Sequence, residues 1–179
     1  MILIGITGPA QSGKSTLAGE FRRLVKFRGR KYAEKPFAGP LKRMLASIGV
    51  DVSDLSKNVP VPFLDGSITP RIMMQTLGTE WGRSLLPSLW LRVWQHELDD
   101  GANVVTVPDV RFDNEAELIR SMGGTIVHVI RKPTADMLAV PAHASEAGIT
   151  RAKGDIIFRN DRGIEKMTQL AASILDNAK

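Results

Sequence analysis

Cysteine is absent from the 179-residue sequence, which excludes a disulfide scaffold, a thiolate metal site and a cysteine nucleophile. Long apolar runs are absent too, and none approaches the 18 residues that a membrane-spanning helix needs. The N-terminal residues lack the basic stretch that opens a secretory signal. With 43% hydrophobic and 24% charged residues, the composition excludes global disorder. We therefore expect one cytoplasmic domain over residues 1–179, with no membrane partner.

Acidic residues are scarce in the first part of the chain. Residues 1–50 hold ten Lys and Arg but only two Asp and Glu, whereas the remainder holds fourteen against seventeen. Arg22, Arg23, Lys26 and Arg28 crowd the end of an expected helix. Cations at a helix C-terminus are favoured by the helix dipole, so the cluster needs no ligand. A site for a polyanion is the alternative.

Short apolar strands alternate with amphipathic helices along the chain. The apolar pattern predicts strands at residues 2–6, 31–33, 104–107, 125–130 and 155–158. Helices are expected at residues 14–27, 41–48, 88–100, 114–122 and 164–175, and another begins at Pro70 with Thr69 as its N-cap. This order predicts a three-layer α/β fold, in which a parallel five-stranded sheet has helices on both faces.

Residues 8–15, GPAQSGKS, match the phosphate-binding pattern G-x-x-x-x-G-K-[ST] at every fixed position. A strand is expected before the motif and a helix begins inside it, as in the P-loop NTPase fold. Glycines allow successive backbone N–H groups and the helix N-terminus to surround an anion. Lys14 would contact the β- and γ-phosphates, and the Ser15 hydroxyl suits Mg²⁺. The residues expected to bind the nucleotide are Gly8, Gln11, Ser12, Gly13, Lys14, Ser15 and Thr16.

A P-loop predicts a bound nucleoside triphosphate but does not name the reaction. The base-reading N-K-x-D motif of GTPases is absent from the sequence. Motor ATPases are usually longer chains. A short P-loop chain therefore favours a kinase that acts on a small phosphorylated substrate.

Asp109 follows the expected strand 104–107, at the position where P-loop proteins hold magnesium, often through water. An ordinary acidic turn residue is the alternative. Arg111 lies two residues further on, and Glu115 begins the next helix, where a carboxylate suits the helix dipole. Arg111 either faces the transferring phosphoryl group or pairs with Asp109 or Glu115 as a structural clamp.

Residues 69–83 form the second informative segment. At about 100° per residue in an α-helix, Arg71, Gln75, Gly78 and Gly82 fall within a wedge of roughly 60°. An Arg beside a carboxamide suits a phosphate and a base edge. Each interior glycine costs about 1 kcal/mol, so two on one line indicate that either a ligand or another helix packs close. We expect the opposing arc to be buried; it holds Met73, Met74, Leu77, Trp81 and Leu85.

Trp90 and Trp94 lie one turn apart on the next expected helix. Aromatic pairs at this spacing are more often core residues than base platforms. Of the two, Trp90 is the one expected on the ligand side, because it lies in the first turn.

Arg131 opens the segment 131–154, which follows a strand and has no strong periodic pattern. A basic connection at this place can act as a lid that closes over phosphates and supplies charge, with Arg131 as the candidate. Basic loop residues are also often merely solvated. His143 and Glu146 are expected to anchor the loop rather than to bind metal.

In their order along the chain, these motifs resemble the bacteriophage deoxynucleoside monophosphate kinases, a branch of the P-loop nucleoside monophosphate kinases. Besides the P-loop, the resemblance covers residues 37–42, residues 71–83 with Trp90, residues 108–115, His143 with Glu146, and Asp155 with Asn160. It implies phosphorylation of a deoxynucleoside monophosphate by ATP and Mg²⁺, in the host cytoplasm for a phage-encoded chain. It also implies a homodimer. Its parts would be a core (about 1–35, 102–131 and 155–179), a helical substrate-binding insertion (about 36–101) and a lid (about 131–154).

By the same resemblance, the monophosphate is bound by Arg71, Gln75 and Arg83, with Lys42 and Trp90 as further candidates. The catalytic roles fall to Lys14, Asp109, Arg111 and Arg131. Ser15 and Asp109, the latter through water, would hold magnesium.

Two other functions remain open at this point. One is a kinase of another small acceptor, such as dephospho-coenzyme A. The other is a non-catalytic module that binds ATP or nucleic acid. The preferred interpretation predicts no stable nucleic-acid partner.

Overall fold

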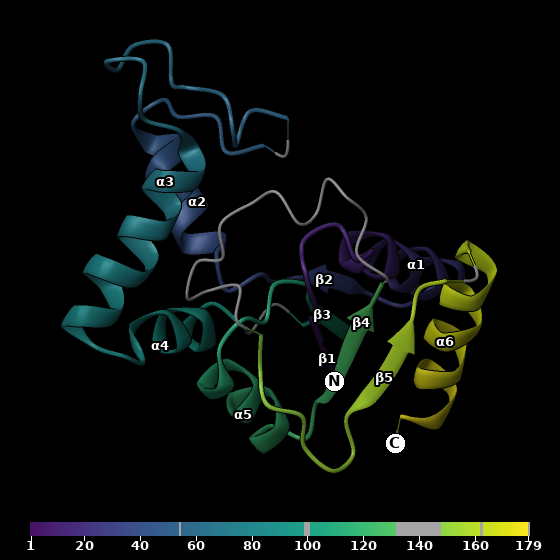
Figure 1. Ribbon diagram of the computed structural model, residues 1–179. Coiled ribbons are helices and arrows are strands. Elements are labelled where there is room, and N and C mark those ends of the chain that lie inside the picture. The colour runs from purple at the N-terminus through teal and green to yellow at the C-terminus, as the bar shows by residue number, and fades with distance from the viewer. Residues whose placement is uncertain (54, 99–100, 132–147, 162, 179) are drawn as a thin grey trace. The chain divides into compact units, whose positions relative to one another are not determined.

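The computed structural model describes residues 1–53, 55–98, 101–131, 148–161 and 163–178 (Figure 1). The chain divides into two compact units. The core unit comprises Met1–Pro36 and Asp99–Lys179, and the inserted unit comprises Phe37–Leu98. No helix among the described residues is both long and apolar enough to cross a bilayer.

A sheet of five parallel strands forms the centre of the core unit. The strands are β1 (Ile2–Thr7), β2 (Tyr32–Glu34), β3 (Val104–Val107), β4 (Thr125–Ile130) and β5 (Ile156–Arg159). Their order across the sheet is β2-β3-β1-β4-β5. The central strands are buried and almost wholly apolar, as a parallel sheet covered on both faces requires. β1 and β3 are neighbours, with Gly5 opposite Val107, so the segments after these strands leave the same edge of the sheet.

Helices cover both faces of this sheet (Figure 1). α1 (Lys14–Phe27) and α6 (Ile164–Asn177) pack on one face, where Leu17, Phe21 and Met167 join the main apolar core. α5 (Asp113–Ser121) packs on the other face. A Cβ atom on Gly5 would lie only 2.8 Å from the Ile119 side chain, so the glycine lets α5 approach the sheet. The expected three-layer fold with its parallel five-stranded sheet is confirmed.

The basic cluster at the end of α1 is compensated by acidic residues. Arg22 pairs with Glu34 at 2.6 Å, and Arg28 pairs with Asp176 at 2.8 Å. Arg23 pairs with Glu20 at 2.8 Å. These ion pairs favour the structural interpretation of the cluster over a polyanion site.

The inserted unit is helical. Its helices are α2 (Gly39–Ser47), α3 (Pro70–Gln75), the π-helix η1 (Thr76–Arg83) and α4 (Leu89–His96). The hydroxyl of Thr69 accepts a hydrogen bond from the N–H of Ile72 at 3.3 Å, which confirms the predicted N-cap before Pro70. Two expectations were wrong. Residues 76–83 are π-helical rather than α-helical, and α4 ends at His96, short of residue 100.

Candidate nucleotide-binding site

The P-loop connects β1 to α1 and depends on two glycines. Gly8 and Gly13 have φ angles of 145° and 106°, a region that side chains rarely allow. A Cβ atom on Gly8 would overlap the carbonyl oxygen of Val129 in β4. Only glycine therefore lets the loop pass this close to the neighbouring strand and open α1 at Lys14.

Lys14 holds its ammonium group over the P-loop. Its Nζ donates to the carbonyl oxygens of Gly8 and Pro9, at 2.8 and 2.6 Å. α1 has no side-chain N-cap and no acidic residue in its first turn. The positive end of the helix dipole and the Lys14 ammonium thus combine at one place, which is the electrostatics of an anion site.

A cavity of about 750 Å³ opens beside this loop, a volume that suits a nucleotide-sized ligand. Its lining brings together several of the predicted residues: Gln11, Gly13, Lys14, Ser15, Thr16 and Arg131. Nη1 of Arg131 donates to the carbonyl oxygen of Gln11 at 3.4 Å. Arg131 therefore lies at the same cavity as Lys14, as its predicted role requires. Asp161 of the β5–α6 connection and Ile164 and Met167 of the first turn of α6 also line the cavity.

Ser12 contributes to this site through its backbone only. Its side chain is fully buried, and its Oγ has no hydrogen-bond partner within the described part of the chain. Its carbonyl oxygen accepts from Nδ2 of Asn160 at 2.7 Å. Asn160 was not among the predicted site residues. The available signal was its position directly after the last strand, at the edge of the sheet where ligands bind.

The turn that carries Asp109 and Arg111 is fixed by Glu115. The Glu115 carboxylate accepts from the backbone N–H groups of Arg111 and Phe112, at 2.8 and 3.2 Å, and is buried. Glu115, the third residue of α5, therefore reaches back to satisfy the N–H groups that precede the helix. Asp109 follows β3, the neighbour of β1, so it lies at the same edge of the sheet as the P-loop. The side chain of Arg111 is exposed.

The two glycines of η1, Gly78 and Gly82, serve helix packing. A Cβ atom on Gly82 would lie 2.5 Å from the ring of Trp90, and one on Gly78 would lie 3.4 Å from Leu41. The indole N–H of Trp90 donates to the carbonyl oxygen of Gly78 at 2.7 Å. Trp90 is 4% exposed. These contacts favour the core interpretation of Trp90 over the ligand-side one, because its ring fills the space that Gly82 leaves.

The predicted apolar arc packs against the core of the inserted unit only in its first half, where its residues are half-buried. Met73, Met74 and Leu77 pack on the core of the inserted unit, but Trp81 is 46% exposed and Leu85 is 65% exposed. The π-helix explains the difference. Its i→i+5 hydrogen bonds widen the turn, which moves every residue after Gln75 away from its α-helical position.

Three of the predicted acceptor residues, Arg71, Gln75 and Arg83, lie along α3 and η1. Arg71 is oriented by the preceding loop, because its Nε donates to Oδ1 of Asn58 at 2.8 Å. Nη1 of Arg83 donates to the carbonyl oxygen of Pro87 at 3.3 Å. Gln75 is half-buried on α3, and Lys42 is exposed on α2.

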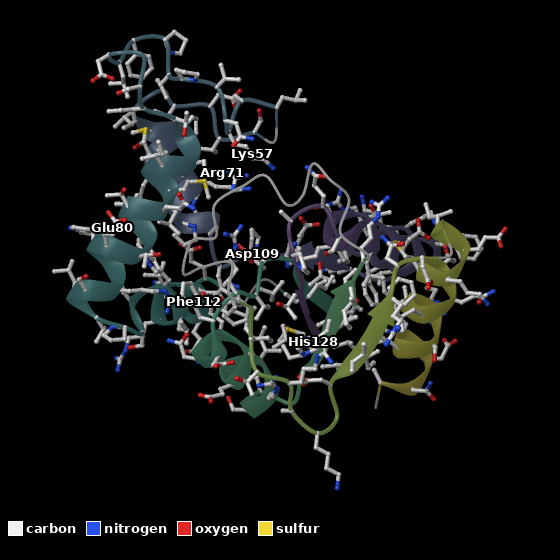
Figure 2. All side chains as sticks on the ribbon, in the orientation of Figure 1. Lys57, Arg71, Glu80, Asp109, Phe112 and His128 are labelled. Carbon is white, nitrogen blue, oxygen red and sulfur yellow. The ribbon has the colours of Figure 1, made fainter. Side chains whose placement is uncertain are left out.

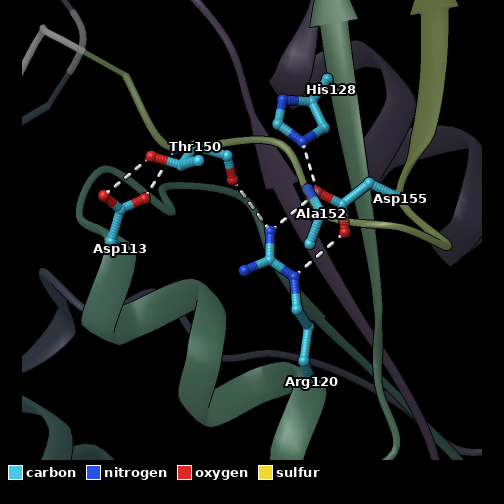
Figure 3. A network of polar contacts seen from close by, with 6 residues as sticks. All are labelled: Asp113, Arg120, His128, Thr150, Ala152 and Asp155. Atoms are coloured by element: carbon cyan, nitrogen blue, oxygen red, sulfur yellow. Dashed lines mark hydrogen bonds and ion pairs between the residues drawn. The ribbon is translucent and has the colours of Figure 1, made fainter.

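A polar network that the sequence did not predict anchors the chain before β5 (Figure 3). Asp155 accepts two hydrogen bonds from Arg120 of α5, at 3.0 and 2.7 Å, and one from the N–H of Ala152. Nε2 of the buried His128 lies 2.8 Å from the same carboxylate. Burial opposes the ionisation of Asp155, but these hydrogen bonds outweigh it and lower its pKa to about 2.

The same network reaches the first turn of α5. The backbone N–H and the hydroxyl of Thr150 both donate to the carboxylate of Asp113, at 2.6 and 3.1 Å. Residues 148–155 are thus tied to α5 at two places. The predicted anchoring pair, His143 and Glu146, lies outside the described residues.

Comparison with known proteins identifies the family. Residues 63–170 match the family described as deoxynucleotide monophosphate kinase. A putative deoxynucleotide monophosphate kinase of Acanthamoeba polyphaga mimivirus is 31% identical, and the match covers 99% of this chain and 98% of the viral protein. The chain belongs to the deoxynucleotide monophosphate kinase family. This confirms the resemblance noted from the motifs and the expected phosphotransferase class.

Other similar proteins match this chain over a shorter part of their length or at lower sequence identity. The deoxynucleotide monophosphate kinase of Enterobacteria phage T4 is 30% identical over 54% of this chain, and that match covers 41% of the phage protein. Among solved structures, APS kinase CysC of Mycobacterium tuberculosis, in complex with AMPPNP and APS, has a TM-score of 0.53 at 18% identity and covers 98% of both chains. Shikimate kinase from Aquifex aeolicus has a TM-score of 0.52 at 14% identity and covers 98% of this chain and 96% of its own. These likenesses confirm the P-loop kinase fold.

Proposed function

We propose that this member of the deoxynucleotide monophosphate kinase family transfers the γ-phosphoryl group of ATP to the phosphate of a deoxynucleoside monophosphate. The observation that carries the proposal, beside family membership, is the placement of Lys14. Its ammonium stands over a glycine-lined loop, at the open N-terminus of α1, in a cavity that admits a nucleotide. The core unit would bind ATP, and the inserted unit would be the substrate-binding insertion.

The residues at the cavity fit a triphosphate. Lys14 now donates to two loop carbonyl oxygens, and phosphate oxygens are stronger acceptors for the same ammonium. The P-loop N–H groups at the start of α1 would hold the phosphates together with it. Arg131 lines the same cavity, so its guanidinium would stabilise charge on the transferring group. We propose the same role for Arg111.

Ser15 and Asp109 are the residues that would hold Mg²⁺. Among the described residues, no cluster of three or more His, Asp or Glu is placed to hold a metal. That fits Mg²⁺ in kinases, which is bound through one or two protein oxygens, substrate phosphates and water. When bound, the ion neutralises charge on the phosphates.

The acceptor side consists of Arg71, Gln75 and Arg83, with Lys42 as a further candidate. Arginine binds phosphate oxygens with two parallel hydrogen bonds, and the Gln75 amide can read a base edge. Trp90 is not part of this proposal, because it is buried against Gly82. A homodimer and a place in the cytoplasm stay predictions.

A coupled assay of ADP release tests the proposal. ATP and Mg²⁺ are offered with each deoxynucleoside monophosphate, each ribonucleotide and dephospho-coenzyme A. Turnover is expected with at least one deoxynucleoside monophosphate, and Lys14→Ala is expected to lower kcat at least about 100-fold. Lys166→Ala, at an exposed position of α6, is the matched control and should leave kcat unchanged.

Two outcomes would contradict the proposal. In the first, dephospho-coenzyme A is the preferred acceptor. In the second, Lys14→Ala turns over as fast as the parent chain.

A further inference from the structure

The helix that carries Arg71 changes its type without a break. Gln75 and Thr76 both keep helical backbone angles where α3 passes into η1. From Thr76 to Arg83 the hydrogen bonds are π-helical. Because a π-helix has a wider turn than an α-helix, residues four apart in the sequence come into line along it.

The burial pattern follows this period of four. Arg71, Gln75, Thr79 and Arg83 are all half-buried. Each next residue along the chain is exposed, namely Ile72, Thr76, Glu80 and Ser84. Figure 2 shows Arg71 and Glu80 on opposite sides of this helix. In an uninterrupted α-helix, Thr79 and Arg83 would be turned about 80° and 120° away from Arg71. The π-helix therefore keeps Thr79 and Arg83 on the same side of the helix as Arg71. We call these four half-buried residues, Arg71, Gln75, Thr79 and Arg83, the row.

The row has the chemistry of a ligand surface. A guanidinium stands near each end, and the Gln75 amide and the Thr79 hydroxyl lie between them. Arg71 is fixed by Asn58 and Arg83 by the carbonyl oxygen of Pro87. For the side chains of Gln75 and Thr79, no hydrogen bond to another described residue is present. Two half-buried polar groups between two oriented arginines are thus available to bind a ligand.

We propose that Thr79 is a fourth acceptor-binding residue, whose hydroxyl forms a hydrogen bond with the deoxynucleoside monophosphate beside Gln75 and Arg83. This inference rests on the proposed function. It also gives the π-helix a role, because η1 places the hydroxyl in register with the two arginines. Thr79 binds substrate in this proposal and takes no part in the transfer itself.

The test compares Thr79→Val, which removes the hydroxyl at nearly constant volume, with Thr79→Ser, which keeps it. Thr79→Val is expected to raise the KM for the monophosphate about tenfold while the KM for ATP stays unchanged. Thr79→Ser should remain within about twofold of the parent chain. Thr76→Val, on the exposed row, is the matched control. Binding is measured separately, as the rise in Tm that each of dAMP, dGMP, dCMP and dTMP causes without ATP.

The two readouts separate this inference from the proposed function. A parent chain that binds a monophosphate without turnover, together with a Thr79→Val variant that has lost this binding, would contradict the function and support the role of Thr79. An unchanged monophosphate KM and Tm rise in Thr79→Val would overturn the role of Thr79 while leaving the function in place. An equal rise in the KM for ATP would also overturn it, since a general distortion affects both substrates. A parent chain that neither binds nor turns over any of the four monophosphates would overturn both.

Discussion

The side-chain amide of Asn160 donates to the carbonyl oxygen of Ser12 at 2.7 Å, across 148 residues of sequence. The same nitrogen lies 2.5 Å from the place that a Cβ atom on Gly13 would take. Gly13 thus serves two purposes: its φ angle lets α1 begin, and its missing side chain admits Asn160. The P-loop is held in shape by a residue that lies far outside its own motif.

Asn160→Asp should weaken ATP binding, because a carboxylate cannot donate to the Ser12 carbonyl and adds negative charge beside the phosphates. We expect the KM for ATP to rise about tenfold or more, together with a lower Tm. Steady-state kinetics and thermal unfolding measure the two effects. Asn177→Ala is the matched control, since the Asn177 amide donates to Ser173 at the end of α6, away from the P-loop motif in sequence. An unchanged KM for ATP in Asn160→Asp would show that the loop keeps its shape without this bond.

Asp155 predicts how stability depends on pH. Its pKa of about 2 in the folded chain lies below its ordinary value of 3.8, so its ionised form stabilises the fold. That contribution, about 2 kcal/mol, is fully present above about pH 5 and is lost progressively as the pH falls from there to about 1. In urea unfolding, Asp155→Asn should be less stable than the parent chain at pH 6. The difference in unfolding free energy between the two chains should become smaller as the pH is lowered.

Glu80→Gln is the control for this experiment, because Glu80 is exposed on η1. Its stability should follow that of the parent chain at every pH. The difference in unfolding free energy between Asp155→Asn and the parent chain could instead stay constant down to pH 2. That result would mean that the charge of Asp155 does not contribute to stability.

Much of the core unit could be predicted from the sequence because its signals are local. β3 and β4 have the predicted bounds, since each is a run of apolar residues with no competing pattern. α1 also has the predicted bounds, because Gly13 and the helical spacing of Leu17 and Phe21 define it. The fixed positions of the P-loop motif predicted one part of the cavity lining, namely Gln11 and residues 13–16, but not the part formed by Asn160 and the residues up to Met167.

The features that escaped prediction depend on residues distant in the sequence. Asp155 meets Arg120 and His128 from 35 and 27 residues away, and nothing in one sequence pairs them. The π-helix is equally hidden, because residues 76–83 suit either kind of helix. The position of Trp90 in its helix was predicted, but the face on which it packs depends on Gly82 in another element.

Asn58 should act as a positioning residue for the acceptor site. It accepts from Nε of Arg71, so Asn58→Ala would remove one of the contacts that orient the guanidinium. We expect the KM for the monophosphate to rise about three- to tenfold while kcat and the KM for ATP change little. Asn58→Asp should raise the monophosphate KM further, since its carboxylate would compete with the phosphate for Arg71. Ser67→Ala in the same loop is the control. Equal effects on both substrates would contradict a role through Arg71.

Gly82→Ala tests the packing that fixes η1. Its Cβ atom would lie 2.5 to 2.6 Å from three atoms of the rigid Trp90 ring. The collision should cost about 1–3 kcal/mol of unfolding free energy, which outweighs the gain of about 1 kcal/mol in helix propensity. Gly78→Ala is the matched control: its Cβ atom would meet the flexible end of Leu41 at 3.4 Å, so this variant should be as stable as the parent chain or gain up to about 1 kcal/mol in helix propensity.

A double-mutant cycle with Trp90→Phe makes the Gly82 prediction specific. The smaller ring gives the new methyl group room, so Gly82→Ala combined with Trp90→Phe should cost less than the sum of the two single changes. Urea unfolding measures all four chains. Strictly additive costs would mean that Gly82 and Trp90 do not constrain each other. In that case packing against Gly82 would not hold the indole against η1. Trp90 would then have to be considered again as a residue of the acceptor site.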